Sequence, residues 1–278
     1  MFAGRIRGQR MLAIAVTLSV LAGCAGSRDD EPVHLVYVER PVDSIYNQAL
    51  DALTAGRHQQ AALLFDEVER QHPYSTWARR AMLFSAYGYY EANKYEEAIG
   101  ATDRFIKLHP GNKHVAYAYY LQAICYYEQI TDVGRDQDTT RKASEALREV
   151  MRRFPSSEYA RDAKLKFDMT RDHLAGKEMA VGRFYQKDHK YVAAINRFNK
   201  VLEEFQTTSH TPEALHRLTE TYLAMGVDEE AQATAAVLGY NYPGSKWYKR
   251  SYNLLAEKDL QPKAEEKSWI SRTVDRVL

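Results

Sequence analysis

The sequence predicts an all-α protein: a solenoid of about five helix pairs, wound as a right-handed superhelix and closed by a C-terminal capping helix. Two observations carry this prediction. Small and aromatic residues recur with a spacing of 37 residues, as at Ala49, Ala86 and Ala123, and a proline ends most copies. The chain also lacks the βαβ pattern and the series of glycine-rich hairpins that indicate sheets. Because one helix pair cannot bury its own apolar face, we expect the copies to stack.

The first residues predict a lipoprotein signal peptide over 1–23. Arginines precede an apolar run at 11–21, which is too short to span a bilayer. The tetrad Leu21-Ala22-Gly23-Cys24 follows, and it resembles a bacterial lipobox, in which the cysteine becomes the lipidated N-terminus. We expect Cys24 to carry a diacylglycerol and an acyl chain. An ordinary secretory signal, or a chance cysteine after an apolar run, is the alternative.

Composition favours a folded body on a tether. The 278 residues are 45% hydrophobic and 27% charged, which suits a sizeable core, and the net charge of +1 does not favour nucleic acid. Residues 24–41 are predicted to be the lipid-anchored tether. If Cys24 is lipidated, Cys125 has no partner for an intramolecular disulfide. Its apolar neighbours predict a buried side chain rather than a nucleophile.

The most regular copy of the repeat spans 79–110. Its skeleton residues are Ala86, Tyr89, Ala98, Phe105 and Pro110. The alanines let two helices approach closely, the aromatic rings fill the space beside them, and the proline cannot continue the second helix. In the third copy the closing residues arrive eight residues late, because a polar insertion falls within 130–140. Ser75, Ser157 and Ser245 follow the ends of three copies and are predicted N-caps of the next helices.

The fourth and fifth copies complete the series. The fourth holds Gly182, Tyr185, Ala194, Phe198 and Val201, and the fifth holds Thr219, Tyr222, Ala231, Leu238 and Pro243. A helical pattern at 156–174 precedes the fourth copy and predicts that its first helix is extended. A capping helix fits 246–258, and a charged tail occupies 261–278. The folded body is thus expected to comprise repeats one to three over 42–155 and repeats four and five with the cap over 156–260.

The first helices of the pairs are expected to line a groove, and residues between their anchors are candidates for peptide binding. In the first three pairs these residues are Tyr46, Leu83, Tyr87, Tyr90, Glu91, Tyr117, Tyr120 and Tyr127. Tyrosine offers a large rigid contact area and a hydroxyl at low entropic cost, which suits this role. In the last two pairs the same face carries charged residues such as Arg183, Glu213 and Glu220. The alternative is that the tyrosines pack between repeats or beneath the tether.

A second candidate is Arg197, which lies between Ala194 and Phe198 on a predicted second helix. Since both neighbours are predicted to face the core, Arg197 should point outward, where it is either solvated or in contact with a partner. Catalysis is not indicated: the nine histidines are scattered, and no glycine-rich phosphate loop or Gly-x-Ser-x-Gly elbow occurs. We expect no enzyme activity, no metal and no cofactor beyond the covalent lipid.

Helix pairs with these anchors resemble tetratricopeptide repeats, whose usual period is about 34 residues. The ordered combination of lipobox, tether, five repeats, an insertion in the third and a long helix in the fourth resembles the BamD family. Its members are lipoprotein subunits of the outer-membrane β-barrel assembly machinery. The resemblance covers nearly the whole chain and is weakest in the 261–278 tail.

The resemblance implies a non-enzymatic scaffold that is lipid-anchored at the periplasmic face of the outer membrane. Its implied partners are unfolded outer-membrane proteins at the N-terminal repeats, and BamA with the other lipoproteins of the complex at the C-terminal repeats. Arg197 resembles the family's arginine that meets the last POTRA domain of BamA. A scaffold lipoprotein for secretin or pilus assembly is the alternative, and a cell-wall enzyme is a third, disfavoured by the missing acid/base constellation.

Overall fold

The computed structural model describes residues 39–263, and from Arg40 on they belong to one compact unit. Every element in this range is an α-helix, which confirms the predicted fold class. In chain order the helices are α2 (Val42–Thr54), α3 (His58–Gln71), α4 (Thr76–Glu91), α5 (Tyr95–Leu108), α6 (Val115–Glu128), α7 (Asp138–Arg153), α8 (Glu158–Lys187), α9 (Tyr191–Glu204), α10 (Thr211–Met225), α11 (Asp228–Asn241) and α12 (Lys246–Ala256). The predicted signal peptide, Cys24, nearly all of the tether and most of the tail lie outside the described residues.

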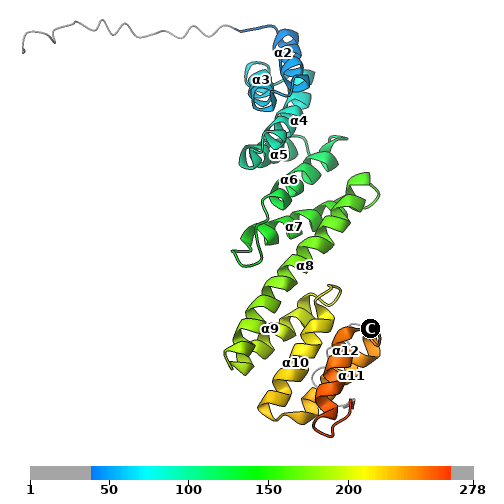
Figure 1. Ribbon diagram of the computed structural model, residues 1–278. Helices are drawn as coiled ribbons and strands as arrows, with labels where there is room; N and C mark the ends of the chain where they lie inside the picture. The colour runs from blue at the N-terminus through cyan, green and yellow to red at the C-terminus, as the bar shows by residue number, and fades with distance from the viewer. Residues whose placement is uncertain (1–38, 264–278) are drawn as a thin grey trace, which may run out of the picture. The chain divides into compact units, whose positions relative to one another are not determined.

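The helices form five successive pairs, α2/α3, α4/α5, α6/α7, α8/α9 and α10/α11, with α12 packed against the last of them (Figure 1). Each second helix also packs against the first helix of the next pair, so the pairs form a continuous stack. None of the described helices combines the length and apolar character needed to cross a bilayer.

The turns inside the pairs share one conformational requirement. Four of the five pairs turn through a residue with positive φ: Gly56 at 72°, Asn93 at 57°, His189 at 57° and Gly226 at 74°. Glycine adopts this left-handed conformation without a steric penalty, and asparagine tolerates it better than most residues do. Gly56 and Asn93, in the first and second pairs, are 37 residues apart, and so are His189 and Gly226 in the fourth and fifth pairs. This distance is the period of the sequence repeat.

The predicted skeleton of the repeat lies in the core. Ala86, Ala98 and Phe105 are fully buried, and Tyr89 is nearly so. The hydroxyl of Tyr89 donates a hydrogen bond of 2.6 Å to Oδ2 of Asp66 on α3, which ties the second pair to the first. The three predicted serine N-caps are confirmed: Ser75, Ser157 and Ser245 each accept a backbone N–H of the helix that follows.

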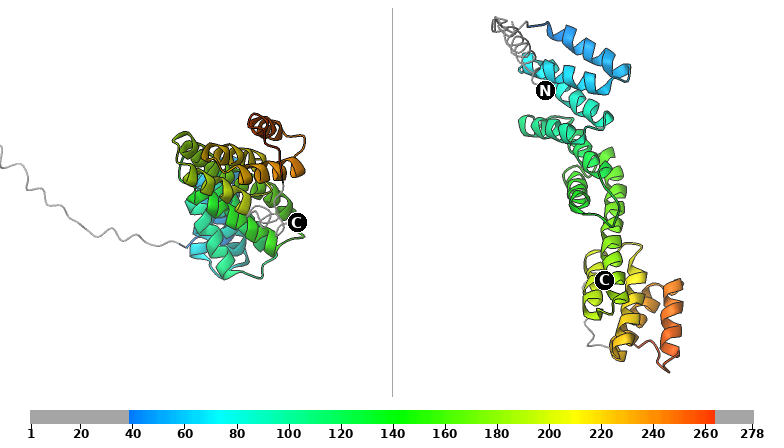
Figure 2. Two further views of the ribbon diagram at one scale, coloured as in Figure 1. Left: turned by 90° about the horizontal axis from the view of Figure 1, so that it is seen from below. Right: turned by 60° about the vertical axis from the view of Figure 1, so that its left-hand side comes forward.

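The predicted extension of the fourth pair is α8, a single helix of 30 residues that belongs to two cores (Figure 2). Ala163 and Phe167 in its first half pack with residues of α6 and α7. Ala175 and Met179 in its second half pack with residues of α9, α10 and α11. One apolar cluster therefore ends and the next begins inside α8. The predicted division of the folded body into two halves between 155 and 156 stays a prediction.

The insertion in the third pair is an ordered loop between α6 and α7. Gln137 is buried, and its amide donates hydrogen bonds to the carbonyl oxygens of Asp132 and Arg135. Lys177 of α8 reaches back to the same loop, where its ammonium donates to the Gly134 carbonyl at 3.0 Å. The insertion thus joins the third pair to the second half of α8.

Candidate peptide-binding and docking sites

Tyrosines of α4 and α6 come together on one surface, as the helical spacing predicts. Tyr87, Tyr90 and Tyr117 are half-buried and pack against the same small cluster of buried residues. Burial raises the pKa of Tyr87, and the neighbouring carboxylate of Glu91 adds to this effect. Burial is also the main cause of the raised pKa of Tyr117. These side chains therefore stay neutral at physiological pH and can donate hydrogen bonds.

The tyrosine stripe on α6 is partly covered by α8. The hydroxyl of Tyr120 donates a hydrogen bond of 2.6 Å to Oδ2 of Asp162, and its ring centroid lies 5.1 Å from that of Tyr159. The hydroxyl of Tyr127 lies 3.5 Å from the sulfur of Met169. These three contacts all join α6 to α8, so packing between repeats accounts for part of the stripe. Such contacts fix the tyrosine rings in place.

One predicted groove residue is in the core instead. Tyr46 is only 5% exposed, and its ring makes edge contacts with Phe65 at 5.4 Å and with Trp77 at 4.7 Å between centroids. The prediction that Tyr46 lines a groove is therefore wrong, because Trp77 of the next pair closes over it. Leu83 is half-buried beside Met82 and Phe105 and presents only part of its side chain.

Tyr159 extends the aromatic surface and was not among the predicted residues. Its ring centroid lies 5.8 Å from that of Tyr117 and joins this ring to Tyr120. The feature of the sequence that could have indicated this role is the position of Tyr159, two residues after the N-cap Ser157. That position is at the start of α8, the helix that covers α6. The surface formed by Tyr87, Tyr90, Glu91, Tyr117, Tyr120 and Tyr159 is called the aromatic surface below.

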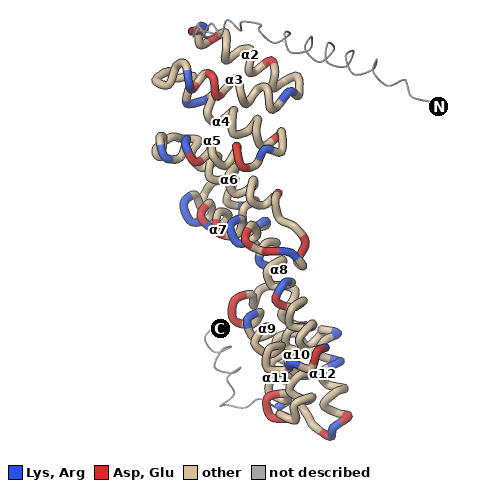
Figure 3. Tube along the Cα trace, turned by 90° about the vertical axis from the view of Figure 1, so that its left-hand side faces the viewer, with Lys and Arg blue, Asp and Glu red and all other residues tan. Residues whose placement is uncertain are grey.

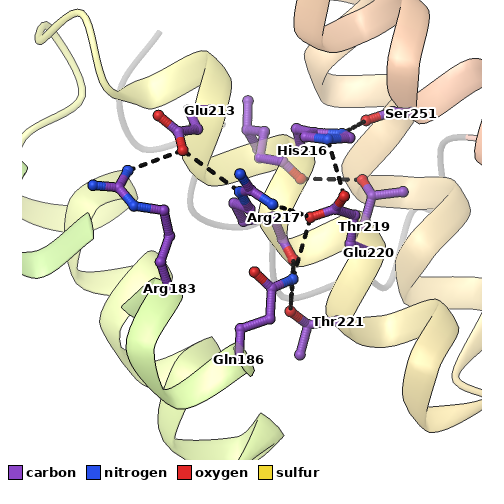
Figure 4. A network of polar contacts seen from close by, with 10 residues as sticks. Arg183, Gln186, Glu213, His216, Arg217, Thr219, Glu220, Thr221 and Ser251 are labelled. Atoms are coloured by element: carbon purple, nitrogen blue, oxygen red, sulfur yellow. Dashed lines mark hydrogen bonds and ion pairs between the residues drawn. The ribbon is translucent and has the colours of Figure 1, made fainter. Parts of the chain in front are cut away.

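Charged residues of the last two pairs form a connected network between α8, α10 and α12 (Figure 4). Arg183 pairs with Glu213 at 2.9 Å, and Arg217 lies between Glu213 and Glu220. His216 is buried, with one ring nitrogen 3.3 Å from Glu220 and the other 2.9 Å from the hydroxyl of Ser251. Because Glu213 and Glu220 each have a cationic partner, the charges on this part of the groove face are neutralised by neighbouring residues of the protein itself.

Arg197 belongs to an ion cluster between α8 and α9. Its guanidinium donates to Glu178 at 3.0 Å, and the ammonium of Lys200 donates to the other oxygen of the same carboxylate at 2.7 Å. Glu178 is 12% exposed, whereas the side chain of Arg197 is 42% exposed. A guanidinium has five N–H donors, so Arg197 keeps donors that face solvent after it has bonded Glu178. The predicted outward orientation is confirmed.

Within 39–263 no three histidine, cysteine or acidic side chains come close enough to hold a metal ion. Cys125 is fully buried, and burial raises the pKa of its thiol to about 12. Since the thiolate is the nucleophilic form, this cysteine is a packing residue.

Comparison with known proteins gives a consistent result. Residues 38–238 match the family model described as "YfiO: Outer membrane lipoprotein". The chain is 55% identical over 253 residues to outer membrane protein assembly factor BamD of Caulobacter vibrioides, a match that covers 91% of this chain and 82% of that protein. The chain belongs to the BamD family. It is also 42% identical to BamD of Rickettsia prowazekii, over 87% of this chain and 95% of that protein.

For this BamD-family protein, the charged network predicts a pH-dependent stability. Burial alone would raise the pKa of Glu220, but the hydrogen bonds and charges of His216 and Arg217 outweigh it and hold the pKa at about 2. The carboxylate stabilises the fold fully above its ordinary pKa of about 4.5, and this contribution is lost as the pH falls towards 2. We expect Glu220→Gln to cost about 2 kcal/mol of unfolding free energy at pH 7.

Urea unfolding at a series of pH values checks this expectation. The difference between Glu220→Gln and the unchanged protein should shrink as the pH falls from 4.5 to 2. Glu229→Gln, on the exposed first turn of α11, is the matched control and should change stability by less than about 0.5 kcal/mol. A constant difference across this pH range would show that Glu220 is not held in its charged form by the network.

Proposed function

We propose that this chain is a non-enzymatic lipoprotein subunit of the outer-membrane β-barrel assembly complex. The observation that carries the proposal is its 55% identity, over 91% of its length, to an outer membrane protein assembly factor. Cys24 would anchor the chain to the periplasmic face of the outer membrane through its acyl chains. A stack of helix pairs without a metal cluster in its described part suits a scaffold.

The aromatic surface is the proposed site for unfolded outer-membrane proteins. Its rings are held by contacts such as Tyr120 with Asp162, so little side-chain entropy is lost when a peptide binds. The half-buried tyrosines offer ring faces and hydroxyls to an extended segment, and Leu83 and Tyr127 are half-buried as well. Glu91 adds a negative charge beside Tyr87 that would favour a peptide without acidic residues at that point.

Arg197 is the proposed docking residue for the POTRA region of BamA. It is half-exposed and fixed in position by the largely buried carboxylate of Glu178, so binding a partner carboxylate would not require its side chain to be ordered anew. The C-terminal pairs around it are the proposed surface for the other lipoproteins of the complex. No feature of the described residues favours a secretin or pilus scaffold over this role.

Genetic replacement tests the proposed function. In Caulobacter vibrioides cells depleted of their own BamD, we expect this chain to restore the level of folded, heat-modifiable β-barrel proteins in the outer membrane. Cys24→Ser should fail to do so, because serine cannot carry the diacylglycerol and the acyl chain that together would anchor the protein stably to the membrane. Normal export of the unchanged chain without recovery of β-barrel proteins would contradict the proposal and would favour a different secretion scaffold.

A further inference from the structure

A cationic hollow of about 460 Å³ lies between α7, α8 and α9 and shares no lining residue with the aromatic surface. Five lysine and arginine side chains line it against three glutamates. Figure 3 shows that α7 and α8 carry many of the charged residues of this part of the stack. The hollow exists because α8 is long enough to separate the second helices of the third and fourth pairs.

Three of the lining cations have no carboxylate partner. In the described part of the chain, no acidic side chain lies within ion-pair distance of Arg148, Arg171 or Lys177. By contrast, Arg152 and Arg153 on the same helix as Arg148 both pair with Glu149. On α7, Arg141 at the hollow pairs with Asp138, so Arg148 is the lining cation of this helix that has no carboxylate partner among the described residues.

These cations are nevertheless held in place by neutral groups. Arg171 donates to the carbonyl oxygen of Glu204, and its guanidinium carbon lies 5.8 Å from the ring centres of both Phe167 and Phe205. Arg148 lies 5.3 Å from the centre of the Phe167 ring. Carbonyl oxygens and ring faces orient a guanidinium without cancelling its charge. The arginine N–H groups that remain can bind a carboxylate in the bidentate manner.

The rest of the lining narrows the class of ligand. Glu178 is already neutralised by Arg197 and Lys200, whereas the other two lining glutamates have no such partner. The two unpaired glutamates would repel any anion placed beside them, a carboxylate as well as a phosphate, so the ligand must space its negative charges to meet the unpaired cations. Leu174 and Phe205 add apolar contact between the charged groups. This mixture fits a peptide in which carboxylates alternate with apolar side chains.

We propose that the hollow between α7, α8 and α9 is a docking site for an acidic segment of a partner protein. This extends the proposed function: the hollow adjoins the Arg197 cluster, because Glu178 and Lys200 belong to both, and it adds residues of α7 to the docking region without requiring Arg197 to contact BamA. The insertion has a role in this site: the carbonyls of Gly134 and Arg135 hold Lys177 at the edge of the hollow.

Fluorescence anisotropy with two labelled hexapeptides tests the proposal. The full chain in detergent should bind the sequence DLEDLE at least about tenfold more tightly than the uncharged NLQNLQ, and the difference should shrink with added salt. Arg148→Glu should weaken DLEDLE binding about tenfold or more. Arg161→Glu, the same change at an exposed arginine of α8 outside the hollow, should weaken it less than about twofold.

Three results would overturn the proposal. Equal affinity for the two peptides, or equal loss in the two variants with unchanged thermal unfolding, would show that no specific acidic site exists. Tighter binding of phosphatidylglycerol vesicles than of DLEDLE, with the same dependence on Arg148, would assign the hollow to lipid phosphate instead. Because the assay contains no BamA and no barrel substrate, its failure would leave the proposed assembly function standing.

Discussion

Arg197→Glu is expected to abolish co-purification of the chain with BamA. The change removes the proposed docking cation and places a negative charge where a partner carboxylate would bind. Truncation of one partner in a desolvated charge pair typically costs about 2–4 kcal/mol of binding free energy, and charge reversal adds repulsion. The affinity should therefore fall by about 30-fold or more, measured by interferometry with the isolated POTRA region.

Lys200→Glu is the matched control for this experiment. Lys200 bonds the same carboxylate as Arg197 does, so both variants bring a second negative charge close to Glu178. Any loss of local stability should therefore be similar in the two variants, and both should be compared by thermal unfolding. Lys200 also lines the hollow between α7, α8 and α9. If Lys200→Glu reduces the affinity as strongly as Arg197→Glu, the docking role belongs to the hollow or to the general charge of this region and not to Arg197 alone.

Gly182→Ala is expected to destabilise the fourth pair by about 2–3 kcal/mol. A Cβ atom on Gly182 would lie 2.5 Å from a ring carbon of Phe198, closer than carbon atoms approach without a shift. Phe198 is fully buried in the largest apolar cluster, so its ring has no solvent-filled space into which to move. The close approach of α8 and α9 therefore depends on the missing side chain, as the repeat pattern predicts for this position.

Gly100→Ala provides the opposite case. No atom lies within 4 Å of the position that a Cβ on Gly100 would occupy, and the residue is within α5. Alanine has the higher helix propensity, so this change should stabilise the protein by up to about 1 kcal/mol. Adding Phe198→Leu to Gly182→Ala should recover part of the stability that Gly182→Ala loses. Unfolding of the unchanged protein, the two single variants and the double variant measures the coupling between the two positions. Additive effects would contradict a direct clash with Phe198.

The sequence was informative wherever the physical cause was local or periodic. The small residues Ala86 and Ala98, the serine caps and the extended α8 all follow from spacing within one helix or one pair. The outward position of Arg197 follows from its buried neighbours in the same way. These features could be predicted because helical geometry fixes which residues share a face.

The remaining features depend on contacts between segments that are distant along the chain. Tyr46 has the spacing of a groove residue, but Trp77 of the next pair covers it. Tyr159 reaches the aromatic surface only because α8 crosses α6, and the cations of the hollow meet only where α7 and α9 flank α8. Periodicity assigns a face to a residue without saying which neighbour will cover that face.

Photo-crosslinking in intact cells tests most directly the claim that this protein has separate substrate and partner surfaces. A benzoylphenylalanine would replace Tyr87, Arg197 or, as a control, the exposed Tyr240 of α11 in three otherwise identical strains. We expect the probe at position 87 to capture unfolded β-barrel proteins and the probe at position 197 to capture BamA. Capture of the same proteins at both positions, at the level seen from position 240, would contradict the division of function between the two halves.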